Sequence, residues 1–250
     1  MKLKTRTPEE VKKRFTRSLL TGLICAVLGA VAFFEISSHV AEEDEIPLVL
    51  RKVLEWNGRI SAAIQGDTLS VSKPRPPKGK KPRVNGDLGL RMPVDFNSYR
   101  VMVESGSQNL SLPLSAFMAL PKVAYTTDFR CIEGWSEVTN YAGGRFSEFM
   151  KAYQLGKKPD GSYYRYVGLE TPDSEYFVSI DMDSMLHPQT VLAYEMNEAS
   201  LSADNGAPIR LIIPIKYGIK SIKRIGRIFF SDTRPPDYWA NEGYDWFSGL

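Results

Sequence analysis

The chain has 250 residues, of which 43% are hydrophobic and 24% charged, a composition typical of a folded protein. Its formal net charge of +3 is too small to indicate nucleic-acid binding, so we expect no nucleic-acid partner. Only one of the two cysteines lies outside the apolar N-terminal segment, and with two histidines this leaves the usual zinc sites short of ligands. The sequence also lacks the phosphate-loop, dinucleotide-binding and nucleophile-elbow motifs.

The N-terminal region has the charge pattern of a membrane anchor. Residues 1–17 are rich in lysine and arginine, residues 18–34 carry no charge, and residues 42–45 are acidic. The uncharged run is long enough to cross a bilayer core, and the basic flank favours the cytoplasm. We predict a basic cytoplasmic tail at 1–17 and a single-pass inner-membrane anchor at 18–38, with the remaining chain in the periplasm. A cleaved signal peptide is the alternative, with His39-Val40-Ala41 as a weak cleavage site.

Residues 39–83 are predicted to contain a helix and a linker. Pro47 suits the first turn of a helix over 46–64, in which apolar residues recur at helical spacing. Residues 72–84 are rich in proline and basic residues, which indicates an extended connector. The folded domain is therefore expected at 84–250.

Residues 84–250 alternate between short strands and few helices, which predicts the α+β class. A helical turn is expected at 115–120 and a helix at 146–153. The residues at 181–186 and 191–197 suit either a helix or a strand. Strands are predicted at 99–103, 109–112, 164–169, 176–180, 209–214 and 225–230.

Cys131 is the one cysteine outside the apolar N-terminal segment, and it lies in Asp-Phe-Arg-Cys-Ile-Glu-Gly-Trp-Ser, residues 128–136. A lone thiol leaves three roles open: packing, nucleophilic attack, or a single thiolate bond to a metal held mainly by a non-protein group. His187 is a candidate base for the nucleophilic role, although no third group accompanies the pair.

A second chemical signal is a basic loop around Gly218. It contains Lys216, Lys220, Lys223 and Arg224. Basic side chains and backbone amides in a glycine-containing loop suit a phosphate group. The alternative is a charged sheet edge that discourages aggregation.

The cysteine segment resembles the cysteine loop of the sulfite oxidase family of molybdopterin enzymes. Later segments resemble further motifs of that family in the same order, and they are most similar to the catalytic subunits of periplasmic methionine sulfoxide reductases. These segments are Tyr166-Val-Gly-Leu-Glu-Thr171, the run at 205–223 that begins Asn-Gly-Ala-Pro-Ile-Arg, Arg234-Pro-Pro-Asp-Tyr-Trp239 and Gly243-Tyr-Asp-Trp246.

The resemblance implies a sulfite-oxidase-like fold, the Mo-molybdopterin cofactor and roles for individual residues. Cys131 would be the catalytic thiolate ligand of molybdenum. Thr171, Asn205 and Arg210 would contact the pterin, and Ser221, Ile222 and Lys223 would hold its phosphate. Asn85 is a candidate for an upstream asparagine of the family.

The activity implied by the resemblance is a two-electron oxygen-atom transfer, with reduction of sulfoxides such as methionine sulfoxide as the leading reaction. Electrons would be exchanged with a membrane haem protein or a cytochrome. Sulfite oxidation is an alternative, but Arg130 is the one basic residue in the cysteine loop that could hold a dianion. A non-catalytic anchored binding domain with the same fold is the other alternative.

Overall fold

The computed structural model describes residues 7–38, 52–53, 56, 60, 73–77 and 80–250. The chain divides into two compact units, residues 1–64 and 65–250. Most of the predicted helix at 46–64 lies outside the described residues, although Lys52, Val53, Trp56 and Ile60 are helical. The predicted connector at 72–84 is described only in part, and its described residues contain no helix or strand.

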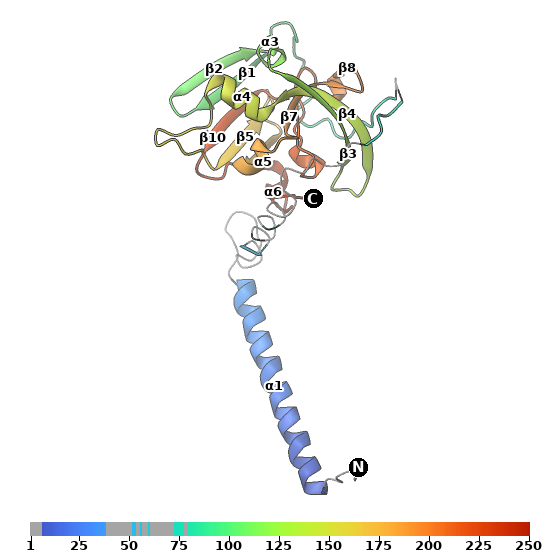
Figure 1. Ribbon diagram of the computed structural model, residues 1–250, viewed down its shortest axis with the longest axis vertical. Helices are drawn as coiled ribbons and strands as arrows, with labels where there is room; N and C mark the ends of the chain where they lie inside the picture. The colour runs from blue at the N-terminus through green and yellow to red at the C-terminus, as the bar shows by residue number, and fades with distance from the viewer. Residues whose placement is uncertain (1–6, 39–51, 54–55, 57–59, 61–72, 78–79) are drawn as a thin grey trace. The chain divides into compact units, whose positions relative to one another are not determined.

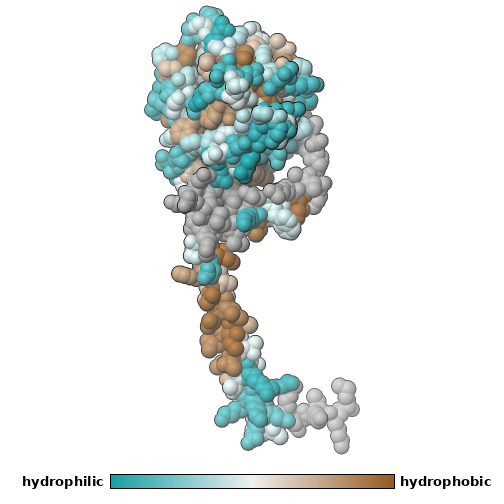
Figure 2. All heavy atoms as spheres, turned by 90° about the vertical axis from the view of Figure 1, so that its left-hand side faces the viewer, coloured by the Kyte–Doolittle hydropathy of each residue, from teal (hydrophilic) through white to brown (hydrophobic). Residues whose placement is uncertain are grey.

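Helix α1 (Pro8–Ser38) begins with a capping box. The Thr7 amide donates to the Glu10 carboxylate at 3.0 Å, and the Glu10 amide donates to the Thr7 hydroxyl at 3.4 Å. Pro8 occupies the first helical position, which requires no amide donor. The helix therefore starts within the predicted basic tail and continues through the predicted anchor. It is long and apolar enough to cross a membrane, and hydrophobic residues cover much of its length (Figure 2).

Two five-stranded sheets form the second unit (Figure 1). The first sheet has the strand order β2-β1-β10-β5-β6, in which β1 and β10 are parallel and the other neighbours antiparallel. In β1, buried Val101 and Val103 alternate with exposed Arg100 and Met102, as a half-buried strand requires. The strands are β1 (Arg100–Ser105), β2 (Gln108–Pro113), β5 (Tyr166–Glu170), β6 (Phe177–Asp181) and β10 (Arg227–Ser231).

The second sheet is antiparallel and follows the order β3-β4-β7-β8, with β9 also paired to β7. Its two longest strands, β3 and β4, form a hairpin whose connecting turn contains Cys131. The sheet thereby places the end of this hairpin beside the segments that follow β8 and β9. The strands are β3 (Lys122–Arg130), β4 (Ser136–Arg145), β7 (Val191–Met196), β8 (Ala199–Ser200) and β9 (Arg210–Ile212).

Short helices cover the sheets and close the core. In α4, Phe146, Phe149 and Met150 share one face and are buried. The Phe149 ring stacks on Phe117 of α3 with centroids 5.1 Å apart, and burying each of these side chains contributes about 1.5–3 kcal/mol. The helices are α3 (Leu114–Met118), α4 (Phe146–Tyr153), α5 (Met182–Leu186), α6 (Tyr238–Asn241) and the 3₁₀ turns η1 (Ala203–Asn205) and η2 (Gly218–Lys220).

Mixed sheets with few short helices confirm the predicted α+β class. Of the two open segments, residues 182–186 form α5 and residues 191–196 form β7. The structure adds β3 and β4, which the sequence reading did not predict. In β3 the polar Thr126 and Thr127 are both buried, so this strand lacks the alternation of apolar and polar residues by which strands are recognised.

Candidate functional site

Cys131 lies in the tight turn between β3 and β4. Its amide donates to the Trp135 carbonyl at 2.9 Å, and its carbonyl accepts from the Gly134 amide at 3.1 Å. Gly134 has a φ of 88°, a left-handed conformation that glycine adopts without strain. Cys131 is 7% exposed, and burial raises the pKa of its thiol. A positive partner is therefore needed to hold this sulfur as a thiolate.

Cys131 faces a cavity of about 170 Å³ that several separate segments enclose. The 83–88 segment, the β3–β4 hairpin, the loops that flank β9 and the C-terminal region all contribute. Five of the predicted site residues line it together: Cys131, Asn205, Arg210, Ser221 and Lys223. Asn85, the candidate for the upstream asparagine, lines it as well.

Arg210 and Lys223 line this cavity, and both lack a carboxylate partner among the described residues. Arg210 is 4% exposed and donates to the carbonyls of Asn205 and Ser221, both at 3.1 Å, while its buried Nε has no hydrogen-bond partner. Lys223 donates to the carbonyls of Asn85 and Gly86 at 2.8 and 3.0 Å. Burial lowers the pKa of Arg210, and burial together with Arg210 lowers the pKa of Lys223 to about 8. Such a pair of cations fits an anionic group.

The backbone around these cations is already structured. Asn205 ends η1, and its side-chain amide donates to the Ser202 hydroxyl at 2.8 Å. The Ser221 hydroxyl accepts from the Ile213 amide at 3.3 Å, and the Ser221 amide donates to the Gly218 carbonyl at 3.0 Å. Since that amide has a partner within η2, an anion would reach the side chains of this loop more readily than the Ser221 amide.

The other two predicted cofactor contacts do not line the cavity. Thr171 is 2% exposed, and its hydroxyl donates to Asp173 at 2.6 Å within a turn. Ile222 is fully buried in the core, where its carbonyl accepts from the Leu211 amide. Their roles toward the cofactor stay predictions.

The basic loop divides into cations with different functions. Lys223 is the member that lines the cavity, whereas Lys216 pairs with Asp181 and Lys220 with Asp237. Arg224 donates to the backbone carbonyls of Ala207, Leu90 and Met92. The four cations therefore do not form one phosphate cradle, because three of them hold the fold together.

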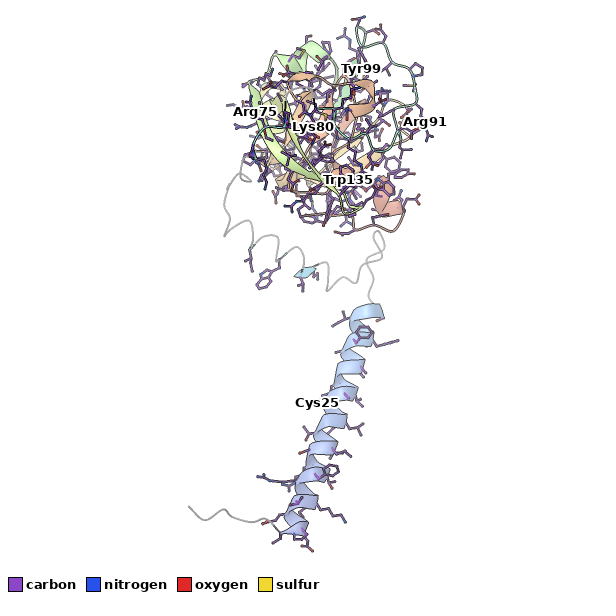
Figure 3. The ribbon with its side chains drawn as sticks, turned by 90° about the vertical axis from the view of Figure 1, so that its right-hand side faces the viewer. Cys25, Arg75, Lys80, Arg91, Tyr99 and Trp135 are labelled. Atoms are coloured by element: carbon purple, nitrogen blue, oxygen red, sulfur yellow. The ribbon has the colours of Figure 1, made fainter. Side chains whose placement is uncertain are left out.

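The structure also adds residues that the motifs did not assign. Arg83 lies over the Trp135 ring at 4.3 Å, and Trp135 donates from Nε1 to the Glu133 carboxylate at 2.9 Å. Trp135 lies on the β3–β4 hairpin (Figure 3). Trp239 and Tyr244 line the same cavity from the C-terminal region. The sequence carried a signal for three of them, since Trp135, Trp239 and Tyr244 belong to the motifs quoted above. His187, the alternative base, does not line this cavity.

Residues 89–239 match the model of the oxidoreductase molybdopterin binding domain. The chain belongs to this family. This result confirms the predicted family and its Mo-molybdopterin cofactor. The matched residues contain Cys131, Asn205, Arg210 and Lys223, so most of the cavity lies within the family domain, while the 83–88 segment and Tyr244 complete it from outside the matched range.

Curated relatives carry more specific names. The chain is 37% identical over 158 residues to the Azospira oryzae protein named "Putative protein-methionine-sulfoxide reductase subunit YedZ1", covering 62% of this chain and 58% of that protein. It is 32% identical over 147 residues to the Campylobacter jejuni protein-methionine-sulfoxide reductase catalytic subunit MsrP, covering 53% and 48%. The chain thus spans about half the length of the curated relatives it matches.

A solved structure shows the same fold. The sulfane dehydrogenase SoxCD of Paracoccus pantotrophus matches with a TM-score of 0.51 and 19% identity, over 57% of this chain and 40% of that one. At this identity the likeness concerns the fold, and it confirms the predicted architecture.

The cavity residues fit the cofactor of the family. A molybdopterin group carries an anionic phosphate and leaves one soft-ligand position for a protein thiolate. Arg210, whose Nε has no hydrogen-bond partner among the described residues, and Lys223 would supply positive charge to the anionic phosphate. Cys131 is the one thiol that lines the cavity. Among the described residues, no cluster of three or more histidine, cysteine or carboxylate groups could hold a metal alone.

Proposed function

We propose that this protein is a molybdenum-dependent reductase of sulfoxides, such as methionine sulfoxide, that transfers an oxygen atom in a two-electron step. The observation that carries the proposal is one cavity that combines the Cys131 thiol with the unpaired cations Arg210 and Lys223. The names of the curated relatives support the choice of substrate.

In this proposal each residue holds one part of the cofactor. Cys131 supplies a thiolate to the metal, Lys223 and Ser221 hold the phosphate, and Asn205 and Arg210 contact the pterin. Arg210 adds positive charge beside Lys223, because it has no carboxylate partner among the described residues. The hydrogen bonds from Arg210 to Asn205 and Ser221 keep these segments together before the cofactor arrives. When bound, the cofactor supplies the oxygen-atom transfer that none of these side chains can perform.

The charge around Cys131 favours a neutral substrate over the sulfite dianion. Glu133, two residues from the cysteine, lines the cavity, and its hydrogen bond from Trp135 lowers its pKa. Arg130 is exposed, pairs with Asp128 at 3.4 Å and does not line the cavity. Arg83, which also lines the cavity, offsets this carboxylate, so the charges nearest to the sulfur leave no excess positive charge for a dianion. A sulfoxide carries no net charge and needs none.

The proposed reaction balances with an external electron donor. The sulfur–oxygen bond of the sulfoxide breaks, the sulfur takes up two electrons and becomes a thioether, and the oxygen leaves as water with two protons. We propose a membrane haem protein or a cytochrome as the donor. The proposed location is the periplasmic face of the inner membrane, with α1 as the single anchor. The same proposal includes the predicted boundaries between tail, anchor, linker and folded domain, after residues 17, 38 and 83.

Metal analysis of the purified chain tests the function. We expect about one molybdenum per chain and reduction of methionine sulfoxide with a reduced viologen dye as donor. Cys131→Ser removes the thiolate, so activity falls by at least about 10³-fold while the fold is retained. Cys25→Ser, which changes the exposed cysteine of α1, is the matched control and leaves both properties unchanged. A wild-type chain that lacks molybdenum when produced in a host that makes the cofactor contradicts the proposal.

A further inference from the structure

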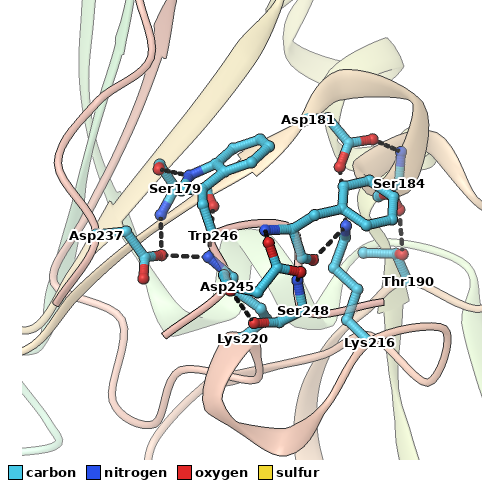
Figure 4. Close-up of polar contacts among 11 residues, drawn as sticks. Ser179, Asp181, Ser184, Thr190, Lys216, Lys220, Asp237, Asp245, Trp246 and Ser248 are labelled. Atoms are coloured by element: carbon cyan, nitrogen blue, oxygen red, sulfur yellow. Dashed lines mark hydrogen bonds and ion pairs between the residues drawn. The ribbon is translucent and has the colours of Figure 1, made fainter. Parts of the chain in front are cut away.

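A buried polar cluster joins three segments of the second unit (Figure 4). It consists of Ser179, Lys220, Asp237 and Trp246. Lys220 Nζ lies 2.5 Å from Asp237 Oδ2 and donates to the Ser179 carbonyl at 3.2 Å. The Ser179 amide donates to Asp237 at 3.0 Å, and Trp246 Nε1 donates to the Ser179 hydroxyl at 2.6 Å. The cluster thus links β6, η2 and the C-terminal region.

The Lys220–Asp237 ion pair is nearly inaccessible to solvent. The side chains are 1% and 2% exposed, and neither lines the cavity. Burying two charges is costly, and an apolar pair of similar volume often stabilises a fold equally well. Fold stability alone therefore does not explain why the chain has this ion pair. Both partners are next to residues that line the cavity, which indicates a role in positioning those residues.

Each partner of the pair is next to residues that line the cavity. Lys220 lies between Ile219 and Ser221, which both face the cavity. Asp237 caps α6 by accepting from the Ala240 amide at 3.2 Å, and α6 carries Trp239 to the cavity. The ion pair therefore fixes the predicted cofactor-binding loop relative to the start of α6.

Trp239 belongs to a continuous group of aromatic rings. The centroids of Trp239 and Tyr244 are 5.1 Å apart, and those of Tyr238 and Tyr176 are 5.6 Å apart. Trp239 also contacts Tyr238, at 5.3 Å between centroids. The Tyr176 hydroxyl donates to the Ile219 carbonyl, so the ring group is tied to η2 at a second point. Trp239, Tyr244 and Tyr176 give the cavity an apolar wall, which we call the aromatic wall.

We propose that the aromatic wall binds the alkyl groups of a thioether-type sulfoxide, and that Lys220 and Asp237 are positioning residues that hold this wall against the cofactor loop. The inference rests on the proposed function. An uncharged sulfoxide offers apolar carbons on both sides of its sulfur, and aromatic rings bind such groups by burial and by contacts with sulfur. Lys220 and Asp237 act through Trp239 and do not touch the substrate.

A double substitution separates positioning from stability. Lys220→Met/Asp237→Leu replaces the ion pair by apolar side chains, which keeps the interior filled without an unpaired charge. In the full-length holoenzyme we expect unchanged molybdenum per chain, a KM for methionine sulfoxide raised about tenfold and a kcat within about twofold of wild type. Calorimetric titration of the oxidised holoenzyme with methionine sulfoxide gives a Kd raised by the same factor, independently of turnover.

Combining variants tests whether the pair acts through Trp239. Trp239→Leu alone is expected to raise KM about tenfold, and adding the double substitution changes it by less than about twofold. Lys216→Met is the matched control, because it breaks another ion pair, between buried Lys216 and partly exposed Asp181, and neither residue lines the cavity. It lowers thermal stability and leaves KM unchanged. If the apolar double variant does not fold, Lys220→Gln/Asp237→Asn retains a hydrogen bond without charge and is compared in the same way.

Three results overturn the inference. One is unchanged KM and Kd in the folded double variant, another is independent and additive effects of the pair and Trp239, and the third is loss of molybdenum with unchanged KM. A molybdenum-containing wild type that neither reduces nor binds methionine sulfoxide contradicts the proposed function instead. An active wild type with unaffected variants contradicts only this inference.

Discussion

The Lys223 ammonium is removed from water, hydrogen-bonded to two backbone carbonyls and close to the positive charge of Arg210. Its ammonium contacts the carbonyls of Asn85 and Gly86, and Arg210 lies in the same cavity without a carboxylate among the described residues. Burial is the larger cause of its lowered pKa, and the positive charge of Arg210 adds to it. An anion bound between the two cations would reverse both effects, because it favours the protonated amine.

This environment predicts a pH-dependent affinity for phosphate groups. In the cofactor-free protein the pKa of Lys223 is about 8, so the side chain is mostly charged at pH 7.5 and mostly neutral at pH 9.5. Binding of an anion requires the proton, so affinity falls as pH rises through this value. We expect the Kd of glycerol 3-phosphate, measured by calorimetry, to rise about tenfold between these two pH values, since a phosphate monoester is a dianion at both. Lys223→Arg stays charged and removes the dependence; an identical dependence in this variant contradicts the assignment.

At the scale of elements, the turn after η1 brings the two ends of the site together. Gly206 has a φ of 95°, and its carbonyl accepts from the Arg224 amide at 3.2 Å. A Cβ at this position would lie 2.9 Å from Lys223 Cα and 2.8 Å from Lys223 Cβ. Asn205 and Lys223, which both line the cavity, are therefore held at a distance that only glycine permits.

Gly206→Ala is expected to damage both stability and cofactor binding. The left-handed backbone alone costs about 1–3 kcal/mol of unfolding free energy, and the contact with Lys223 must also be relieved. Gly161→Ala is the matched control, because Gly161 has a φ of 83° but nothing within 4 Å of the added Cβ. Thermal unfolding and molybdenum content of both variants separate the two effects. Equal molybdenum content in both variants would show that the approach of Gly206 to Lys223 does not matter for binding.

The success of sequence reasoning differed between elements for a physical reason. In α4 the buried Phe146, Phe149 and Met150 follow helical spacing, and the predicted helix has the observed bounds. In β4, by contrast, residues 139–144 are all buried, and Gly143 lies against the β7 backbone, so neither alternation nor strand propensity marks the element. Apolar and polar residues alternate along a strand when only one of its faces is buried. Both faces of β4 are buried over residues 139–144, so this alternation is lost.

The candidate site shows a similar division. The ordered motifs anticipated that Cys131, Asn205, Arg210, Ser221 and Lys223 would meet, although they come from separate segments. They did not show that Lys220 forms a buried ion pair with Asp237, because the sequence shows which residues are charged but not which residues they contact. Arg83 lay in a basic stretch that indicated a connector, yet its guanidinium packs on Trp135. Charged residues that are scattered along the sequence can thus line a site or stabilise the fold. Their role follows from the residues that they contact in the structure.

At the scale of the whole molecule, the surfaces of the apolar helix and of the folded domain suit different environments. Helix α1 exposes hydrophobic side chains along its length, including Leu23, Val27 and Val31, each more than half exposed. A 31-residue helix with such a surface is long and apolar enough to cross a bilayer, as the proposed anchor requires. The polar surface of the second unit requires an aqueous compartment (Figure 2).

The charge on either side of the apolar run at 18–34 predicts the orientation of the chain. Lys12, Lys13 and Arg14 lie at the start of the helix and favour the cytoplasmic face. We expect a C-terminal alkaline phosphatase fusion to be active and a C-terminal fluorescent protein that matures only in the cytoplasm to be dark. Replacing the basic residues of the tail by glutamine should weaken this preference. A reporter pattern that shows the C-terminus in the cytoplasm contradicts the proposed location.

Removal of residues 1–64 should separate anchoring from chemistry. All residues that line the cavity lie between Arg83 and Tyr244, within the second unit. The fragment 65–250 is therefore expected to remain soluble without detergent and to keep about one molybdenum per chain, with viologen-driven activity within about twofold of the full chain. With a membrane-bound electron donor, its rate should fall by at least about tenfold, because the anchor confines enzyme and donor to one surface and raises their effective concentration. The detergent-solubilised full chain is the control, since it loses confinement but retains α1. A fragment that folds but binds no molybdenum would mean that the first unit takes part in forming the site.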